Sequence, residues 1–236
     1  MISLSYDLHI HSCLSPCGDE DMTPANIVGM AALKGLDLIA LTDHNSCKNC
    51  PAFMKFVKEY GILGIPGMEL TTREEVHVLC LFPDLEAALS FGDYVYSKLI
   101  PVKNKAELFG EQQIRNEKDE IAGTIENLLI NSTQIGFTEV YPLVSAYGGV
   151  MIPAHIDKNS NSLISNLGFV PGDSRFTSFE LKNMANLHTL QGMNPYLKGC
   201  NVITDSDAHY LEDINEGVNT LYVREKSVKA VLEALG

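Results

Sequence analysis

Hydrophobic and polar residues alternate at the start of the chain and predict a short first strand over residues 6–11. Leu8 and Ile10 should face one side of this extended segment, and His9 and His11 the other. Further hydrophobic runs predict strands at residues 36–41, 61–69, 76–82, 150–154, 176–181, 200–204 and 221–223.

Helix signals fall between several of these strands. Thr23 supplies a hydroxyl that can cap a helix, Pro24 suits its first position, and Gly35 can end it. Ser227 likewise caps a closing helix with one apolar face. The remaining helical patterns lie at residues 51–60, 84–99, 107–131 and 139–147.

The alternation of strands and helices predicts parallel βα units in an α/β fold. We expect residues 1–236 to form a single domain, because one barrel-sized core suits this length. Residues 84–135 interrupt the alternation and predict a helical insertion beside or over one end of the barrel. An ordinary pair of surface helices is the alternative.

The chain is acidic, with a net charge of −13, which argues against nonspecific binding of nucleic acid. Anionic substrates stay open, because metal ions can supply local positive charge. No stretch resembles a secretion signal or is apolar enough to span a membrane. The chain has 6 cysteines, and without a secretion signal they are expected to be reduced thiols in a cytoplasmic protein.

Histidines gather at the ends of the predicted strands. Of the 7 histidines in the chain, those in such positions are His9, His11, His44, His77, His155 and His209. Glu69 and Asp207 are placed similarly. In a βα barrel the carboxyl ends of the strands open on one face. Imidazole and carboxylate groups bind Zn²⁺, Mn²⁺ and Fe²⁺, and this many ligands predict two or three ions.

Four short motifs in order resemble the polymerase and histidinol phosphatase (PHP) family of metal-dependent phosphoesterases. They are His9-Ile10-His11, Thr42-Asp43-His44, Pro153-Ala154-His155 and Asp207-Ala208-His209. Glu69 and His77 match a bridging glutamate and a following histidine between the second and third motifs. The resemblance spans residues 6–225 and implies a distorted (β/α)7 barrel.

The resemblance also implies which residues bind metal. One ion would take His9, His11, Glu69 and Asp207, and a second would share Glu69 and take His77 and His155. A third would take His44, His209 and a residue of the loop after the first motif. We expect Asp19 in that role, with Glu20 as the alternative.

The implied reaction is attack on phosphorus by a hydroxide that two metal ions share. Glu69, Asp207 and His209 would be the catalytic residues, and the substrate a small phosphorylated metabolite such as a nucleotide or a sugar or alcohol phosphate. Long nucleic acid is not expected to bind. The alternatives are a metal-dependent C–N hydrolase and a noncatalytic regulatory module of the same fold. The oligomeric state is left open.

Cationic residues near the motifs are candidates for binding phosphate. Lys158, three residues after His155, is the first candidate, followed by Arg73, Arg115 and then Arg175. His188 fits no motif and is expected at the surface. Asp43 either orients a ligand histidine or caps the end of its loop.

Two cysteine pairs lie in loops at the same end of the predicted barrel. Cys13 and Cys17 follow the first strand, and Cys47 and Cys50 follow the second. Four thiolates could hold zinc or an iron–sulfur cluster, but the spacing matches no known cluster signature. Partly buried thiols that line the loops are the preferred interpretation.

Overall fold

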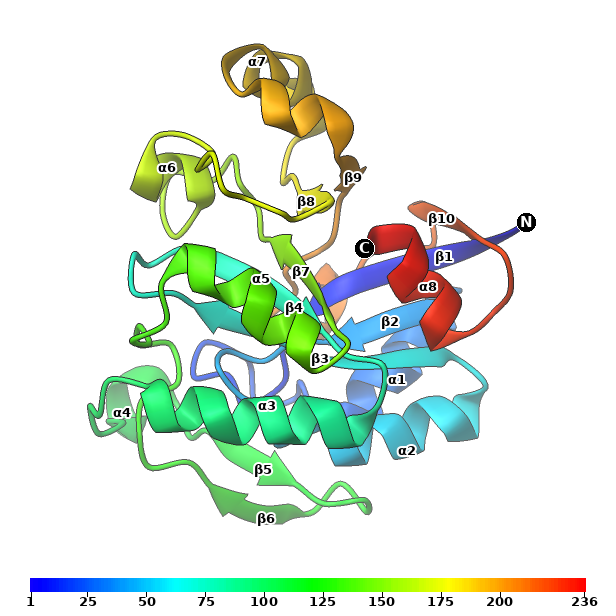
Figure 1. Cartoon of the computed structure of the whole chain (residues 1–236). Helices are drawn as coiled ribbons and strands as arrows, with labels where there is room; N and C mark the ends of the chain where they lie inside the picture. The colour runs from blue at the N-terminus through cyan, green and yellow to red at the C-terminus, as the bar shows by residue number, and fades with distance from the viewer.

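A curled sheet of six strands forms the centre of the computed structural model, which describes all 236 residues (Figure 1). In spatial order these strands are β10 (Thr220–Val223), β1 (Ile2–Ile10), β2 (Leu38–Leu41), β3 (Leu63–Thr71), β4 (His77–Leu81) and β7 (Val150–Pro153). A separate pair of parallel strands consists of β8 (Ser178–Glu180) and β9 (Asn201–Ile203).

Backbone hydrogen bonds continue the curl around this strand pair. The Ile156 amide after β7 donates to the Glu180 carbonyl of β8 over 2.9 Å. After β9, the Ala208 carbonyl accepts from the His11 amide at the end of β1 over 3.0 Å. The α/β class is therefore confirmed, and the curled half-barrel sheet is consistent with the predicted distorted barrel, while the number of seven βα units stays a prediction.

Strand direction differs from the purely parallel pattern that we predicted. β1, β2 and β3 are parallel, but β4 runs antiparallel to both β3 and β7. The connection from β3 to β4 covers only residues 72–76, too short for the crossover that a parallel pair needs. As a result His77, the first residue of β4, pairs with Thr71 at the carboxyl end of β3.

Helices cover the outer face of the sheet, and one helix closes an end of it. The outer helices are α1 (Pro24–Leu33), α2 (Cys50–Tyr60), α3 (Leu85–Lys98) and α5 (Phe137–Ala146), and the closing helix is α8 (Val228–Leu235). The predicted caps are confirmed. The Thr23 hydroxyl accepts from the Asn26 amide over 3.3 Å, and the Ser227 hydroxyl accepts from the Ala230 amide over 3.2 Å.

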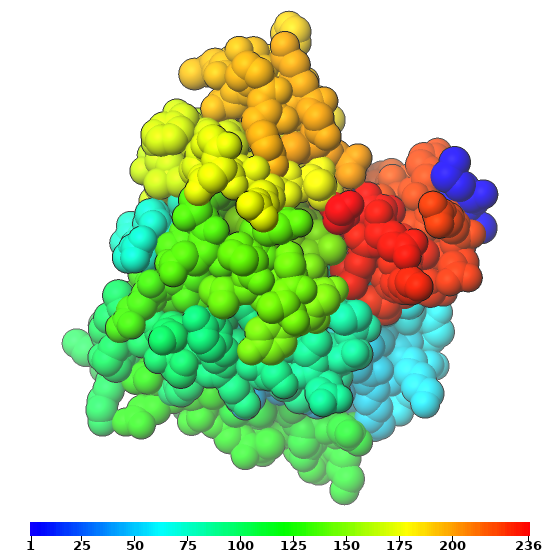
Figure 2. All heavy atoms as spheres, in the orientation of Figure 1, coloured from blue at the N-terminus to red at the C-terminus, as the bar shows by residue number.

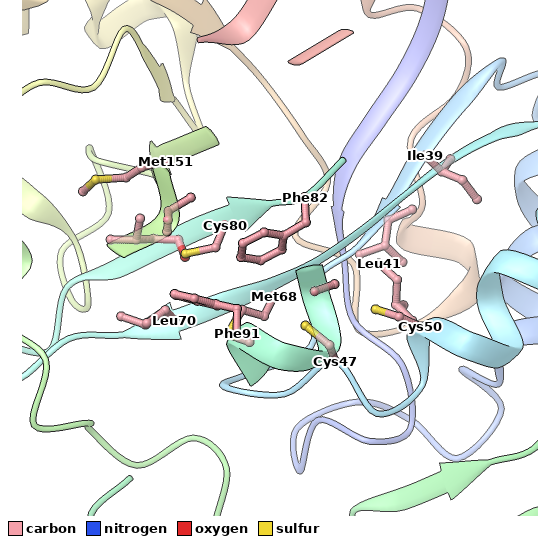
Figure 3. Packing of buried hydrophobic residues seen from close by; sticks show 14 of the residues in the cluster. Ile39, Leu41, Cys47, Cys50, Met68, Leu70, Cys80, Phe82, Phe91 and Met151 are labelled. Atoms are coloured by element: carbon pink, nitrogen blue, oxygen red, sulfur yellow. The ribbon is translucent and has the colours of Figure 1, made fainter. Parts of the chain in front are cut away.

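Two hydrophobic cores follow from this arrangement. The larger lies between the sheet and its outer helices, where Met68 and Cys80 of the strands and Phe82, just after β4, meet Phe91 of α3 (Figure 3). The smaller joins side chains of several strands, including Leu4, to Leu235 and other residues of α8. Because α8 packs near the beginning of β1, the other end of the barrel is left for the histidines.

An irregularity in β1 changes the side-chain alternation that we predicted. The pairing of β1 with β2 shifts between Asp7 and Ile10, as in a β-bulge. Leu8 therefore packs in the smaller core and Ile10 in the larger core, so the prediction that both share one side is wrong.

The predicted helix over residues 107–131 is also wrong. This stretch contains the end of the short helix α4 (Ala106–Phe109) and a hairpin of β5 (Gln113–Arg115) and β6 (Ile121–Thr124). The Asn116 side chain accepts from the amides of Lys118 and Glu120, and Asp119 has a left-handed φ of 64°. Asparagine and aspartate favour such turns, and here they outweigh the helix-like spacing of apolar residues.

Residues 84–135 pack against loops that carry predicted ligands. Leu99 and Leu129 form a small core with Leu14 of the loop after β1. The Asn45 side chain, next to His44, donates to the Leu129 carbonyl over 2.7 Å. Whether this region is an insertion that covers the site stays a prediction.

Much of the chain between β7 and β9 forms a projection beyond the barrel. It carries α6 (Leu163–Leu167) and α7 (Leu187–Met193), together with the 3₁₀ turns Met184–Asn186 and Pro195–Gly199. Figure 2 shows this part, in yellow and orange, rising above the body of the molecule. A further 3₁₀ turn, Leu211–Asp213, follows β9. None of the helices is long and apolar enough to cross a membrane.

Candidate metal centre

The two histidines of β1 point their ring nitrogens at each other. The Nε2 atoms of His9 and His11 lie 3.1 Å apart, and both side chains are fully buried. Two nitrogens on one tetrahedral ion, each about 2.0–2.1 Å from it, lie about 3.3 Å apart. The spacing therefore suits two ligands of one metal ion.

Glu69, at the carboxyl end of β3, is the centre of the cluster. Its two carboxylate oxygens lie 2.9 to 3.4 Å from ring nitrogens of His9, His11, His44, His77 and His155. His77 reaches this carboxylate because β4 starts where β3 ends. The structure thus brings five of the predicted ligands onto one buried carboxylate.

Asp207 and His209 complete the cluster from the segment after β9. One Asp207 oxygen lies 3.4 Å from His9 Nε2 and 3.5 Å from His11 Nε2. The His209 ring stacks on His11 with centroids 4.3 Å apart. Three sets of side chains are close enough for their donor atoms to share an ion: His9, His11 and Glu69; His44, Glu69 and His77; and His11, His44 and His209.

Several buried atoms in this cluster that could ligate a metal make no hydrogen bond. They include Nδ1 of His44, Oε2 of Glu69 and Nδ1 of His155. Such a buried atom costs about 1–3 kcal/mol when it is left unpaired. Cations among the rings would satisfy the His44 and Glu69 atoms, and imidazole with carboxylate is a donor set for divalent transition metals. The residues therefore fit a metal centre.

The charges of the cluster also suit metal binding. Burial would raise the pKa of Glu69, but His77, His9 and His44 together hold it well below its usual range. Burial and the neighbouring His11 lower the pKa of His209 to about 3. The carboxylate is thus ionised and this imidazole neutral, the forms in which each binds a metal.

Buried partners orient the β1 histidines. The Glu180 carboxylate accepts from Nδ1 of His9 and from the His155 amide, each over 3.0 Å. The Ser15 hydroxyl contacts Nδ1 of His11 over 2.9 Å and donates to Asp43 over 2.8 Å. Asp43 thus both fixes the loop that carries Ser15 and positions His11 through Ser15.

Glu180 was not among the predicted site residues, although the sequence carries a signal for it. The predicted strand at residues 176–181 ends on this single carboxylate. Glu180 is fully buried in β8, so its place beside His9 depends on the pairing that closes the barrel.

Replacing Glu180 by alanine should weaken metal binding about 10–100-fold, because partners of a ligand histidine fix its orientation and basicity. Metal titration of the purified variant, with circular dichroism as the test of folding, measures the effect. Glu233→Ala, on the exposed surface of α8, is the control. Unchanged affinity in a folded Glu180→Ala protein would contradict the orienting role.

Neither acidic candidate of the first loop reaches the histidines with its side chain. The Asp19 carboxylate accepts from the Asp21 amide over 2.9 Å, and Glu20 is exposed. The Asp19 backbone amide, in contrast, donates to the His209 carbonyl over 3.0 Å. The loop lies at the site, but the structure does not place these two carboxylates on a shared ion.

One of the predicted cations is in contact with the cluster. Lys158 donates to Asp207 over 3.0 Å, and Lys182, which we did not predict, donates to the Ser206 carbonyl over 2.7 Å. Arg73 pairs with its neighbour Glu74.

The other cationic candidates and the unassigned histidine lie outside the cluster. Arg115 bonds within the β5–β6 hairpin, to Gln113 and to the Asp119 carbonyl. Arg175 lines a separate pocket beside α5. His188 is exposed on α7, as expected.

The four loop cysteines do not form a common cluster. Cys47 and Cys50 pack in the larger core, and their thiols donate to the Gly67 carbonyl over 3.1 and 3.6 Å (Figure 3). Cys13 is buried, whereas Cys17 is exposed. The preferred interpretation of loop thiols therefore fits Cys13, Cys47 and Cys50, while Cys17 differs from them.

Three of the known proteins that are similar to this chain illustrate its relationships. Endonuclease Q from Pyrococcus furiosus, a lesion-specific endonuclease, superposes with a TM-score of 0.71 at 20% identity, over 99% of this chain and 56% of that one. A proposed metal-dependent phosphoesterase from Bifidobacterium adolescentis has a TM-score of 0.62 at 18% identity, over 98% and 95% of the chains.

The third is the 5′-3′ exoribonuclease Rnm of Salmonella typhimurium, 30% identical over 129 residues, which are 52% of this chain and 42% of that protein. The chain spans about half or less of the length of the curated relatives it matches.

One protein of this fold has been solved with nucleic acid bound. A structure of endonuclease Q with a 27-mer duplex substrate superposes on 99% of this chain, and on 56% of that one, with a TM-score of 0.68 at 19% identity. Our prediction that long nucleic acid does not bind is therefore wrong, because a protein of the same fold holds a duplex. A family model describing the PHP domain matches residues 7–168, and by this match the chain belongs to the PHP domain family.

Proposed function

We propose that this PHP domain is a metal-dependent phosphoester hydrolase. The observation that carries the proposal is the buried Glu69 carboxylate, within 3.4 Å of ring nitrogens of five histidines. In βα barrels the catalytic groups lie at the carboxyl ends of the strands, and these metal donors converge at that end. The chain retains every ligand type that the motifs require, which argues against a noncatalytic module.

The ligands divide among two or three divalent ions, either Mn²⁺, Zn²⁺ or Fe²⁺. His9, His11, Glu69 and Asp207 would bind the first, and Glu69, His77 and His155 the second. His44 and His209 would bind a third together with a residue of the first loop. When bound, such ions acidify water and neutralise phosphate oxygens.

The chain's own residues would recognise the phosphate and hold the ligands in place. Lys158 is held beside the cluster by Asp207, and its side chain is 39% exposed, so its ammonium group can also reach a substrate. Burial opposes its charge, but Asp207 outweighs burial and raises the pKa of Lys158, so the lysine stays cationic. This cation favours a phosphoester substrate over a C–N bond.

A small phosphorylated metabolite, including a nucleotide, is the first candidate substrate. Lys158 and Lys182 place two ammonium groups at the Asp207 segment, enough to bind one phosphate. A nucleic-acid strand is the second candidate, and the similarity to an exoribonuclease and to endonuclease Q supports it. Glu69, Asp207 and His209 would be the catalytic residues in either case.

The test is a panel of phosphorylated metabolites and 5′-phosphorylated DNA and RNA oligonucleotides, assayed with the purified chain and added Mn²⁺. We expect phosphate release or strand shortening by the wild type and none by His9→Ala, which lacks a ligand of the first ion. Lys158→Ala should lose activity, whereas Lys229→Ala, exposed on α8, should not.

Hydrolysis of a phosphoester together with these variant effects would support the proposal, and the active substrates would decide between metabolite and nucleic acid. Full turnover by His9→Ala would overturn it. Inactivity on every phosphoester, with metal demonstrably bound, would turn the assignment toward C–N hydrolysis or a regulatory role.

A further inference from the structure

A polar cavity of about 480 Å³ lies beside the Asp207 segment of the metal centre. Asp207 lines this cavity, and one of its oxygens also lies 3.4 Å from His9 and 3.5 Å from His11. Lys182, another lining residue, donates to the Ser206 carbonyl over 2.7 Å. The cavity therefore shares a wall with the metal centre, and its volume is within the range of about 300–1,000 Å³ that is common for small-molecule sites.

The lining of this cavity is almost entirely polar. Of its nine residues, Val218 is the only hydrophobic one, and none is aromatic. An alkyl chain or a nucleobase would therefore find little surface to pack against. A ligand group that displaces water from such a cavity keeps its affinity only when it reproduces the hydrogen bonds of the water. The cavity thus favours a ligand part that carries hydrogen-bonding groups.

Three side chains in the lining have groups without a partner in the protein. Asp205 is only 6% exposed, and its Oδ1 atom accepts from the Leu8 amide, but its Oδ2 atom makes no hydrogen bond. Asp213 and Asn215 are held by their backbone amides, which donate to the Tyr210 carbonyl and to Asp7, while their side chains are unbonded. These groups are available to a ligand.

Other residues of the lining hold the cavity together. The Thr204 hydroxyl donates to the Asn219 side chain over 3.1 Å, and the Asn219 amide group donates to the Thr204 carbonyl over 2.7 Å. Thr204 follows β9, and Asn219 precedes β10. The cavity is therefore bounded by two segments that the protein ties to each other.

We propose that this cavity binds the hydroxyl-rich part of a sugar monophosphate whose phosphate lies at the metal centre. The inference rests on the proposed function and names its substrate class. A hydroxyl group both donates and accepts, so sugar hydroxyls can pair with Asp205 Oδ2 and with the side chains of Asp213 and Asn215. Three carboxylates line the cavity against the single ammonium group of Lys182, so a second phosphate is not expected in it.

Monophosphates that differ in the group carrying the phosphate test the proposal. The probes are ribose 5-phosphate, glucose 6-phosphate, n-butyl phosphate and AMP, assayed with the Mn²⁺-loaded wild type. We expect kcat/KM for the better sugar phosphate to exceed the values for butyl phosphate and AMP by about tenfold or more. The difference should lie chiefly in KM, because the sugar is bound away from the reacting phosphorus.

Substitutions in the cavity supply the second measurement, the ratio of kcat/KM for the sugar phosphate to that for butyl phosphate. Asp213→Ala should lower this ratio by about tenfold and Asn215→Ala by about threefold, because a hydrogen bond to a charged acceptor is the stronger one. Glu212→Ala is the matched control and should keep the ratio, since Glu212 lies on the same exposed 3₁₀ turn but outside the cavity.

Sugar phosphates that fail to exceed butyl phosphate or AMP would overturn the sugar site and leave the proposed function standing. An unchanged ratio in a folded Asp213→Ala protein, or hydrolysis of oligonucleotides alone, would have the same meaning. Absence of hydrolysis of every phosphoester by the metal-loaded protein would overturn both.

Discussion

Glu69→Gln should lower hydrolytic activity by about 10³-fold or more, the largest effect that we expect from a single substitution. Removing one group that stabilises a transition-state charge typically costs about 10²–10³-fold, and Glu69 serves more than one metal position. The amide has nearly the same shape but no charge, so it cannot balance the histidines and cations around it. The loss should come with a loss of bound metal.

The measurement pairs kcat/KM on the substrate that the panel identifies with metal content per chain. Glu126→Gln is the matched control, because Glu126 is an exposed glutamate paired with Lys103 on the β5–β6 side of the molecule. A folded Glu69→Gln protein with full metal content and activity within about tenfold of the wild type would contradict the central role of this carboxylate.

The positions of the ligand histidines were predictable because they depend on where strands end. His44 and His155 each follow a short hydrophobic run, His9 lies near the end of an alternating one, and the carboxyl ends of parallel strands meet at one edge of a sheet. His77 was predicted to lie on a strand of its own, without a reason why its side chain would reach the other ligands. The short turn before β4 supplies that reason, since it makes β4 antiparallel and brings its first residue to the same edge.

Other features could not be read from local pattern, because contacts between distant residues decide them. The bulge in β1 turns Leu8 and Ile10 to different cores and depends on pairing with β2. Glu180 contacts His9 only because β8 closes the barrel, 171 residues away in sequence. Apolar spacing suggested a helix where the turn at Asn116 and Asp119 instead forms a hairpin.

The choice of loop ligand shows the same limit at a single position. Asp19 was preferred to Glu20 because the PHP resemblance places an acidic residue or histidine in this loop. The turn at Gly18 and the bond from the Asp19 amide to the His209 carbonyl hold the loop at the site, while the Asp19 carboxylate accepts from the Asp21 amide. These are properties of the folded loop, which residue type alone does not specify.

Removing the divalent ions with a chelator should lower the melting temperature as well as abolish activity. A ligand present at 100 times its Kd stabilises the folded state by about 2.7 kcal/mol, and each kcal/mol shifts the melting temperature of a chain this size by about 2–4 °C. We therefore expect a fall of about 5–10 °C. The physical reason is the set of buried atoms, such as His44 Nδ1 and Glu69 Oε2, that lie 3.0 Å apart and make no hydrogen bond in the protein.

Differential scanning calorimetry of the metal-loaded and chelated protein measures this shift, and restored Zn²⁺ or Mn²⁺ should reverse it. Glu69→Gln is the matched variant, because a chain that has lost its bound ions should melt at the same temperature with and without chelator. An unchanged melting temperature in wild-type protein from which metal loss has been verified would contradict ligation within the buried cluster. The ions would then have to bind at exposed groups, which order little of the chain and contribute little to its stability.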